Sequence, residues 1–192
     1  MSGKGKYVAL LALLLAAMLA IPMLTPSTVA KKAAVDDAAT EGAALEVHFF
    51  EARKADAILL TTENSAVLID AGEKGFGKTI LSYLEEKGVD HIDYFIITHF
   101  DQDHVGGAAK VINSIKVGIV LQSNQPKDSE EYEKYVKALN NAGIEPVTVQ
   151  EAYEFVLDGV TYTVDPPHQA RYASDSSNNS SLIVSAQNGE NS

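Results

Sequence analysis

The sequence predicts an α/β fold in which sheets are layered with helices on the outside, and three observations favour it. Short apolar runs separated by turn residues follow one another from Leu45 to Ile69, which is typical of an antiparallel meander. Strand and helix patterns then alternate as far as Gly143, which is typical of crossover connections. Short strand patterns return after Pro146. Meanders and crossovers in one chain indicate a sandwich-like layer structure.

The first half of the predicted fold begins with strands and contains one long helix. The strands are expected at residues 45–50, 57–62, 66–69 and 94–98, with a turn at residues 63–65. The helix covers residues 78–87, where apolar side chains recur at helical spacing, and it ends at Gly88. The strand over residues 94–98 is so apolar that we expect it to be buried on both faces.

The second half alternates helices with shorter strands. Helices are expected at residues 108–115 and 129–142, the latter capped by Asp128 or Ser129 and ended by Gly143. Strands are expected at residues 117–121, 147–149, 154–157, 161–164 and 181–186. The dipeptide Asp158-Gly159 is the hairpin signal between two of them.

The N-terminus has the order of a secretory signal. Lys4 and Lys6 precede an apolar run over residues 8–24, and small residues follow up to Ala30, where we expect cleavage. The run is long enough that an uncleaved membrane anchor through residues 8–24 is the alternative to residues 1–30 as a signal peptide. Both interpretations predict a protein that is secreted or anchored facing the outside. Residues 31–44 are expected to form a flexible linker before a domain over residues 45–192.

Composition limits the chemistry and the partners. The chain of 192 residues is 46% hydrophobic, which fits one globular domain. It contains no cysteine, so any metal must be held by histidine, carboxylate, carbonyl or water. Loss of residues 1–30 would remove two lysines and no acid, which changes the formal net charge from −11 to −13. Such a charge repels polyanions at long range, and the sequence has no strong basic patch for nucleic acid.

Four potential metal ligands lie within the stretch "THFDQDHVGG" after the apolar strand over residues 94–98. They are His99, Asp101, Asp103 and His104. In extended or turn backbone the first two can point to one side and the last two towards a neighbouring point, which would allow two cations to bind close together. Gly106 and Gly107 would let the backbone approach closely before the next helix. The alternative is a solvated loop whose acids cap that helix.

This stretch resembles the hallmark loop of the metallo-β-lactamase-fold hydrolases, His-x-His-x-Asp-His after a buried strand. Asp101 stands where that loop has its second histidine, and this variant followed by Gly-Gly is similar to the hydrolase domain of ComEC-type DNA-uptake competence proteins and their secreted relatives. "LEVHFFEARKADAILL", with Asp56, and "AVLIDAG", with Asp70, are similar to the opening strands of the family. The resemblance covers about residues 45–186 and implies an αββα sandwich.

The resemblance implies roles for the residues of the loop. His99 and Asp101 would hold one metal ion, and Asp103 and His104 the other, with Asp103 also orienting the attacking water as the catalytic residue. Asp70 would accept a hydrogen bond from beneath the loop, or cap the turn at Gly72. Two divalent ions are expected, zinc or manganese, with magnesium also suited because Asp101 makes the site harder and more anionic.

Other positions are weaker candidates for the site. Asn178, Asn179 and Ser181 resemble a segment that lines the site in relatives, and the alternative is a polar loop. His168 is a weak candidate for a further ligand, with a surface loop position as the alternative. For Asp56 we expect a turn cap or support of the loop rather than metal binding.

Relatives in this family continue past the last predicted strand into a Gly-Asp motif with a metal-bridging aspartate and a second half, whereas this sequence stops at Ser192. The resemblance therefore implies the first part of the fold only, a domain incomplete at its C-terminus, with the strand over residues 181–186 lacking its next neighbour. The expected function is a secreted metal-dependent hydrolase that uses metal-activated water on a phosphodiester, DNA included, or another small-molecule substrate. The alternatives are a lactamase- or lactonase-type hydrolase and a non-catalytic, truncated metal-binding module.

Overall fold

The computed structural model describes residues 44–169 and 177–189. All of them belong to one compact unit, Val35–Ser192. Within these two ranges, no helix has the length and apolar character needed to cross a membrane. The predicted signal or anchor over residues 1–30 lies outside the described residues, as does the linker except for its last residue.

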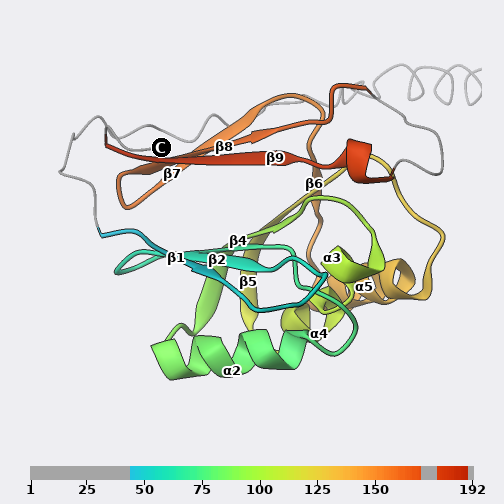
Figure 1. Ribbon diagram of the computed structural model, residues 1–192, viewed down its shortest axis with the longest axis horizontal. Helices are drawn as coiled ribbons and strands as arrows, with labels where there is room; N and C mark the ends of the chain where they lie inside the picture. Colours follow the sequence, from blue (N-terminus) through green and yellow to red (C-terminus); the bar gives the residue numbers. More distant parts are fainter. Residues whose placement is uncertain (1–43, 170–176, 190–192) are drawn as a thin grey trace, which may run out of the picture. The chain divides into compact units, whose positions relative to one another are not determined.

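The larger sheet has six strands in the order in which they occur in the chain (Figure 1). They are β1 (Glu46–Phe49), β2 (Ile58–Thr61), β3 (Ala66–Ile69), β4 (His91–Ile97), β5 (Lys116–Gln122) and β6 (Val147–Thr148). The first three form the predicted antiparallel meander, whereas β3 to β6 run parallel. Parallel neighbours need a crossover, and the helices supply it.

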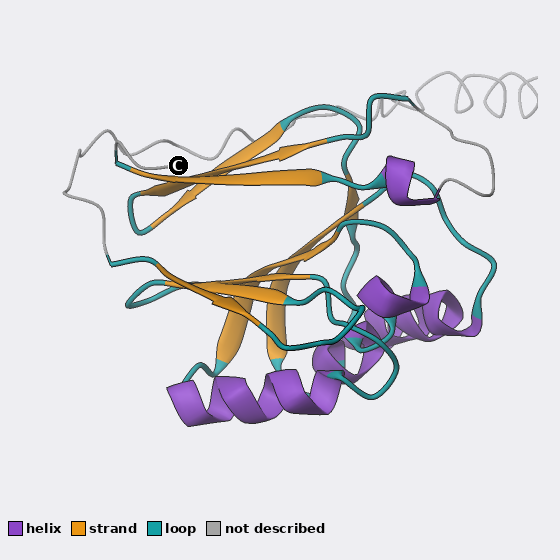
Figure 2. Cartoon of the chain, viewed as in Figure 1, coloured by secondary structure: helices purple, strands orange, loops and turns teal. Residues whose placement is uncertain are grey.

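Three helices cover one face of this sheet (Figure 2). They are α2 (Gly77–Lys87), α4 (Ala108–Ile112) and α5 (Glu130–Ala142). Gly88 and Gly143 end α2 and α5 in the left-handed conformation, and the Ser129 hydroxyl caps the start of α5 by accepting from Tyr132 N. The apolar sides of these helices pack on residues of the sheet such as Leu68 and Phe95, both fully buried.

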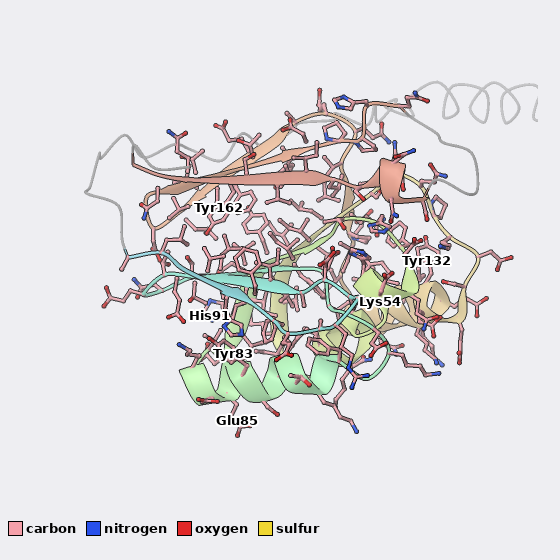
Figure 3. The ribbon with its side chains drawn as sticks, in the orientation of Figure 1. Lys54, Tyr83, Glu85, His91, Tyr132 and Tyr162 are labelled. Carbon is pink, nitrogen blue, oxygen red and sulfur yellow. The ribbon has the colours of Figure 1, made fainter. Side chains whose placement is uncertain are left out.

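A second sheet of three antiparallel strands packs on the other face. It contains β7 (Tyr153–Leu157), β8 (Val160–Asp165) and β9 (Ile183–Asn188). Leu60, Val67 and Ile96 of the first sheet meet Phe155, Val160 and Tyr162 of the second in one core cluster. Figure 3 shows Tyr162 pointing into the space between the sheets. Phe95, Ile96 and Ile97 have no exposed surface, so β4 is buried on both faces as predicted.

The layers are therefore helix, sheet, sheet, which corresponds to the first part of an αββα sandwich. Within the two described ranges, no helix covers the outer face of the second sheet. The strands agree with the predicted ones to within one to three residues at each end. The predicted helix over residues 108–115 is shorter in the structure, because α4 ends at Ile112.

The expectation of extended or turn backbone through the histidine stretch is wrong for part of it. Residues Gln102–Val105 form a single helical turn, α3, because the amides of His104 and Val105 both donate to the carbonyl oxygen of Asp101 at 2.9 Å. A 3₁₀ turn, η1 (Ser177–Ser180), precedes β9 and was not predicted either. Both elements are four residues long, too short for a periodic pattern to identify.

Candidate metal centre

The candidate site lies where three parallel strands end. Because β3, β4 and β5 run in the same direction, their carboxyl ends meet at one edge of the sheet. Asp70 follows β3, the histidine stretch follows β4, and a loop over residues 123–129 follows β5. Ligand sites in open α/β sheets gather at this edge.

Backbone hydrogen bonds join three loops at this edge. Ala71 N donates to the carbonyl oxygen of His104 at 2.8 Å, and Gly107 N donates to that of Gly72 at 3.2 Å. Asp56 N donates to the carbonyl oxygen of Asp103 at 3.2 Å, and the carbonyl oxygen of Asp56 accepts from Gly72 N at 2.9 Å. Backbone hydrogen bonds therefore hold the loop that carries the histidines, independently of its side chains.

The two glycines after the histidines make this junction possible. A Cβ atom on Gly107 would lie 2.2 Å from the carbonyl oxygen of Ala71, and one on Gly106 would lie 2.5 Å from Lys74 N. Neither contact is tolerated by an L-residue with a side chain. The close backbone approach expected of Gly106 and Gly107 is therefore present in the structure.

Asp70 lies beneath the loop with 2% of its surface exposed. Its Oδ1 accepts from Thr98 N at 2.8 Å, and its Oδ2 accepts from Thr98 Oγ1 at 2.7 Å and from His104 Nδ1 at 2.8 Å. A carboxylate only accepts, so His104 carries its hydrogen on Nδ1 and its Nε2 presents a lone pair. Asp70 also has a left-handed backbone with φ of 57°, a conformation that aspartate tolerates at the end of a strand.

Two hydroxyl groups fix the orientation of His99. Its Nδ1 lies 3.1 Å from Thr98 Oγ1 and 3.1 Å from Ser181 Oγ. Thr98 Oγ1 already donates its hydrogen to Asp70, and Ser181 Oγ donates to the carbonyl oxygen of Asn178 at 2.7 Å. Both hydroxyls can therefore only accept from His99, which places the hydrogen on Nδ1 and the lone pair on Nε2.

The two Nε2 atoms lie next to carboxylates without hydrogen bonding to them. His99 is 3% exposed, and within the described residues no hydrogen-bond partner reaches its Nε2, which is 3.7 Å from Asp101 Oδ2. His104 Nε2 lies 3.7 Å from Asp56 Oδ2 and 4.0 Å from Asp103 Oδ1. The two imidazole rings are 3.9 Å apart between centroids. Imidazole lone pairs opposite carboxylate oxygens, that of His99 buried, are a donor set that suits a divalent cation.

The electrostatic environment differs between the two histidines. Burial lowers the pKa of His99, and the neighbouring His104 lowers it further. Burial also acts to lower the pKa of His104, but the hydrogen bond and charge of Asp70 outweigh it and raise that pKa above its ordinary value. His99 is therefore the more firmly neutral of the two.

Asp101 is held by groups from two other segments. Lys127, in the loop after β5, forms an ion pair with Asp101 Oδ1, and Ser177 Oγ donates to Asp101 Oδ2 at 2.7 Å. Burial acts to raise the pKa of Asp101, but these two hydrogen bonds lower it below its usual range. Asp101 Oδ2 is the oxygen that faces His99 Nε2, whereas Oδ1 contacts Lys127.

The segment before β9 brings the second sheet to the site. Leu182 N donates to the carbonyl oxygen of Thr98 at 3.0 Å, and the buried Ser123 Oγ donates to that of Ser180 at 2.6 Å. Of the residues predicted in this segment, Ser181 contacts His99, Asn178 holds Ser181 through its carbonyl oxygen, and Asn179 is exposed. His168 is exposed too, and in the described part of the chain no contact joins it to either histidine.

As they stand, the described residues contain no group of three or more histidine and acidic side chains close enough to enclose one ion. They contain histidine–carboxylate pairs, with separations of 3.7 Å and 4.0 Å that leave the donors unbonded to each other. The chemistry of the donors and the buried lone pair of His99 fit a divalent ion. Opposite His104 Nε2, the side chains of Asp103 and Asp56 are 47% and 70% exposed.

Sequence reasoning missed three contributors to this site. They are Thr98, Ser177 and Lys127, for which the sequence predicted no role. The signal for Ser177 is its place beside the candidates Asn178 and Asn179. Lys127 lies 26 residues from Asp101 in sequence and had no local signal. Asp56 supports the loop through its backbone as expected, and its carboxylate lies 3.7 Å from His104 Nε2, closer than the 4.0 Å of the Asp103 carboxylate.

Comparison with known proteins agrees with this fold. The family model of the metallo-beta-lactamase superfamily matches residues 51–184. Over 111 residues the chain is 31% identical to ComE operon protein 3 of Bacillus subtilis, a match that covers 56% of this chain and 14% of that protein. A mutant of the Cronobacter sakazakii metallo-beta-lactamase with the HARLDQ motif is similar in structure, with a TM-score of 0.50, 20% identity and coverage of 77% of this chain and 57% of that one. The metallo-beta-lactamase from Pontibacter korlensis has a TM-score of 0.44 and 17% identity, covering 76% and 63% of the two chains.

The chain belongs to the metallo-β-lactamase superfamily and is ComEC-like within it, which confirms the resemblance stated from the histidine stretch. It spans 14% of the length of the curated relative and 57% of the matched lactamase structure. Superfamily membership supports a metal-dependent hydrolase in general.

Proposed function

We propose that this chain is a metal-dependent phosphodiesterase that acts outside the cell, secreted or anchored through residues 8–24. The observation that supports it most is the pair of histidines whose Nε2 lone pairs are fixed by Asp70, Thr98 and Ser181. His99 with Asp101 would hold one divalent ion, and His104 with Asp103 the other. Asp56 is a further candidate ligand, because its Oδ2 lies 3.7 Å from His104 Nε2.

Bound ions of this kind supply Lewis acidity and lower the pKa of water towards neutral. The residues of the chain would orient the water and hold the ligands in place. The Asp103 side chain is 47% exposed, so its carboxylate can accept a hydrogen bond from the water that attacks phosphorus. Asp70 holds His104 from behind and does not face the substrate, because only 2% of its surface is exposed. An ion-rich site also offsets the acidic surface of the chain, which by itself repels a phosphodiester.

Asp103→Asn tests this proposal in the full 192-residue chain with manganese and bis(p-nitrophenyl) phosphate as substrate. We expect the hydrolysis rate to fall by about 10²-fold or more, because an anionic ligand and the acceptor for water are both lost. Asp90→Asn is the matched control, since Asp90 is an exposed aspartate immediately before the first residue of β4, whereas the candidate site follows the last residue of that strand. A neutral lactone is assayed in parallel.

A wild-type protein that cleaves the lactone and not the phosphodiester contradicts the proposed substrate class. A wild-type protein that cleaves neither substrate with manganese, zinc or magnesium contradicts the proposed activity. Equal rates for Asp103→Asn and Asp90→Asn on the phosphodiester contradict the role of Asp103.

A further inference from the structure

The loop after β5 carries a lysine that reaches the candidate metal centre. Lys127 contacts Asp101 Oδ1, and its side chain is 39% exposed. The ion pairs between lysine and acid in the described residues are Lys74–Glu130, Lys87–Glu46, Lys134–Glu130 and Lys127–Asp101. Of these, only the last one involves a carboxylate of the histidine stretch.

The loop is short and anchored at both ends, so Lys127 is not on a freely moving arm. Ser123 is 2% exposed and donates from its side chain to the carbonyl oxygen of Ser180, while its amide donates to that of Ile97. At the other end, Ser129 caps α5. Pro126 immediately precedes Lys127 and restricts the backbone between these two anchors. The fold therefore holds the backbone of this loop at the edge of the sheet where Asp101 lies.

Lys127 and His99 face different oxygens of Asp101, so neither contact excludes the other. Lys127 meets Oδ1, whereas Oδ2 is the oxygen that lies 3.7 Å from His99 Nε2 and accepts from Ser177. An ammonium group has three hydrogens, and Asp101 takes one of them. Among the described residues no second side-chain acceptor is paired with this ammonium group, so the other hydrogens can serve an acceptor that enters the site from solvent.

We propose that Lys127 is a substrate-binding residue that recognises an anionic oxygen of a phosphate ester, an inference that rests on the proposed function and names the charge of the substrate. Asp56, Asp70, Asp101 and Asp103 make this edge of the sheet acidic, so a cation of the protein next to the reacting group favours an anion in addition to any bound ions. A charge-assisted hydrogen bond from an ammonium group to a phosphate oxygen supplies it. A neutral lactone or amide would gain less from such a group, because its carbonyl oxygen carries no full charge.

The test measures binding of inorganic phosphate to the full chain by calorimetry, with and without manganese. We expect Lys127→Met to weaken phosphate binding about tenfold, the size of one charge-assisted hydrogen bond, and Lys127→Arg to restore most of it. Lys87→Met is the matched control, because Lys87 is 40% exposed and pairs with Glu46 far from the site. It should bind phosphate as the wild type does. Manganese stoichiometry and circular dichroism are recorded for every variant.

Unchanged phosphate affinity in Lys127→Met, with the fold intact, overturns the inference. It is also overturned if Lys127→Met loses manganese in parallel with phosphate, because the lysine would then act by positioning Asp101. Wild-type protein that binds phosphate through Lys127 and cleaves no phosphodiester refutes the proposed function and leaves this inference standing. If the wild-type protein cleaves the phosphodiester while Lys127→Met binds phosphate normally, the proposed function stands and this inference is refuted.

Discussion

Asp70 Oδ2 accepts a hydrogen bond from His104 Nδ1 at 2.8 Å, and the same oxygen accepts from Thr98 Oγ1, which lies 3.1 Å from His99 Nδ1. One buried carboxylate therefore determines the tautomer of both histidines, directly for His104 and through a hydroxyl for His99. Partners of this kind usually matter nearly as much as the ligands themselves.

Asp70→Asn should weaken both the fold and the metal site. The amide cannot replace a carboxylate that accepts three hydrogen bonds, so we expect a loss of about 2–4 kcal/mol in the free energy of unfolding and a loss of metal affinity of about 10–100-fold. Urea denaturation and calorimetric titration with zinc measure the two effects. Asp93→Asn is the control, because Asp93 lies on β4, accepts from Ala66 N at 2.9 Å and faces His91 rather than His99 or His104. It should lose some stability and keep its metal affinity, and a similar affinity loss in both variants would refute the role of Asp70.

Removing the hydroxyls that hold His99 should reduce metal affinity without unfolding the protein. In Ser181→Ala combined with Thr98→Val, the Nδ1 of His99 loses both acceptors and the ring is free to turn or change tautomer. We expect metal binding to weaken by about 10–100-fold in a calorimetric titration. Ser185→Ala, at an exposed serine on β9, should bind metal normally. Normal affinity in the double variant would mean that burial alone fixes the ring.

Metal-free protein, prepared with a chelator, should be most stable near pH 6.5, the ordinary pKa of histidine. The folded-state pKa of His104 is raised, so its contribution is complete below the unfolded value and is lost as pH rises through the folded value. The folded-state pKa of His99 is lowered, so its contribution is present above the unfolded value and is lost as pH falls through the folded value.

Urea denaturation at a series of pH values tests this prediction. His104→Gln should reduce the decline on the alkaline side, where the raised pKa of His91 also contributes, and His99→Gln should reduce the decline between the unfolded and folded pKa values on the acidic side. If the variants keep both declines, other groups cause them.

Gly107→Ala should damage the loop junction severely. The new Cβ atom would lie 2.2 Å from the carbonyl oxygen of Ala71, which is backbone and cannot move aside cheaply. We expect a loss of about 3 kcal/mol or more in the free energy of unfolding. Gly143→Ala is the control, since Gly143 has φ of 67° but open space around its Cβ position, and left-handed strain alone costs about 1–2 kcal/mol. Chemical denaturation of both variants shows whether the overlap adds to that strain, and equal losses would show that it does not.

Much of the fold could be predicted from local sequence signals. The apolar run around Phe95 identified a strand buried on both faces, and glycines 88 and 143 ended the two long helices where the structure ends them. Such signals work because helix ends and strand alternation depend on residues that are adjacent in the chain. The one-turn helix α3 was missed because four residues carry too little periodicity.

The sequence by itself determined the family, the absence of thiolate ligands, and which four side chains of the stretch from His99 to His104 can ligate a metal. Only the tertiary structure decided how these side chains are held, because the deciding partners are distant in sequence. Asp70 is 34 residues from His104, Lys127 is 26 from Asp101, and Ser181 is 82 from His99. Parallel strand pairing brings the ends of β3, β4 and β5 to one edge, and packing of the second sheet adds the segment before β9. No local pattern encodes such contacts, since they depend on how the sheets pair and pack rather than on neighbouring residues.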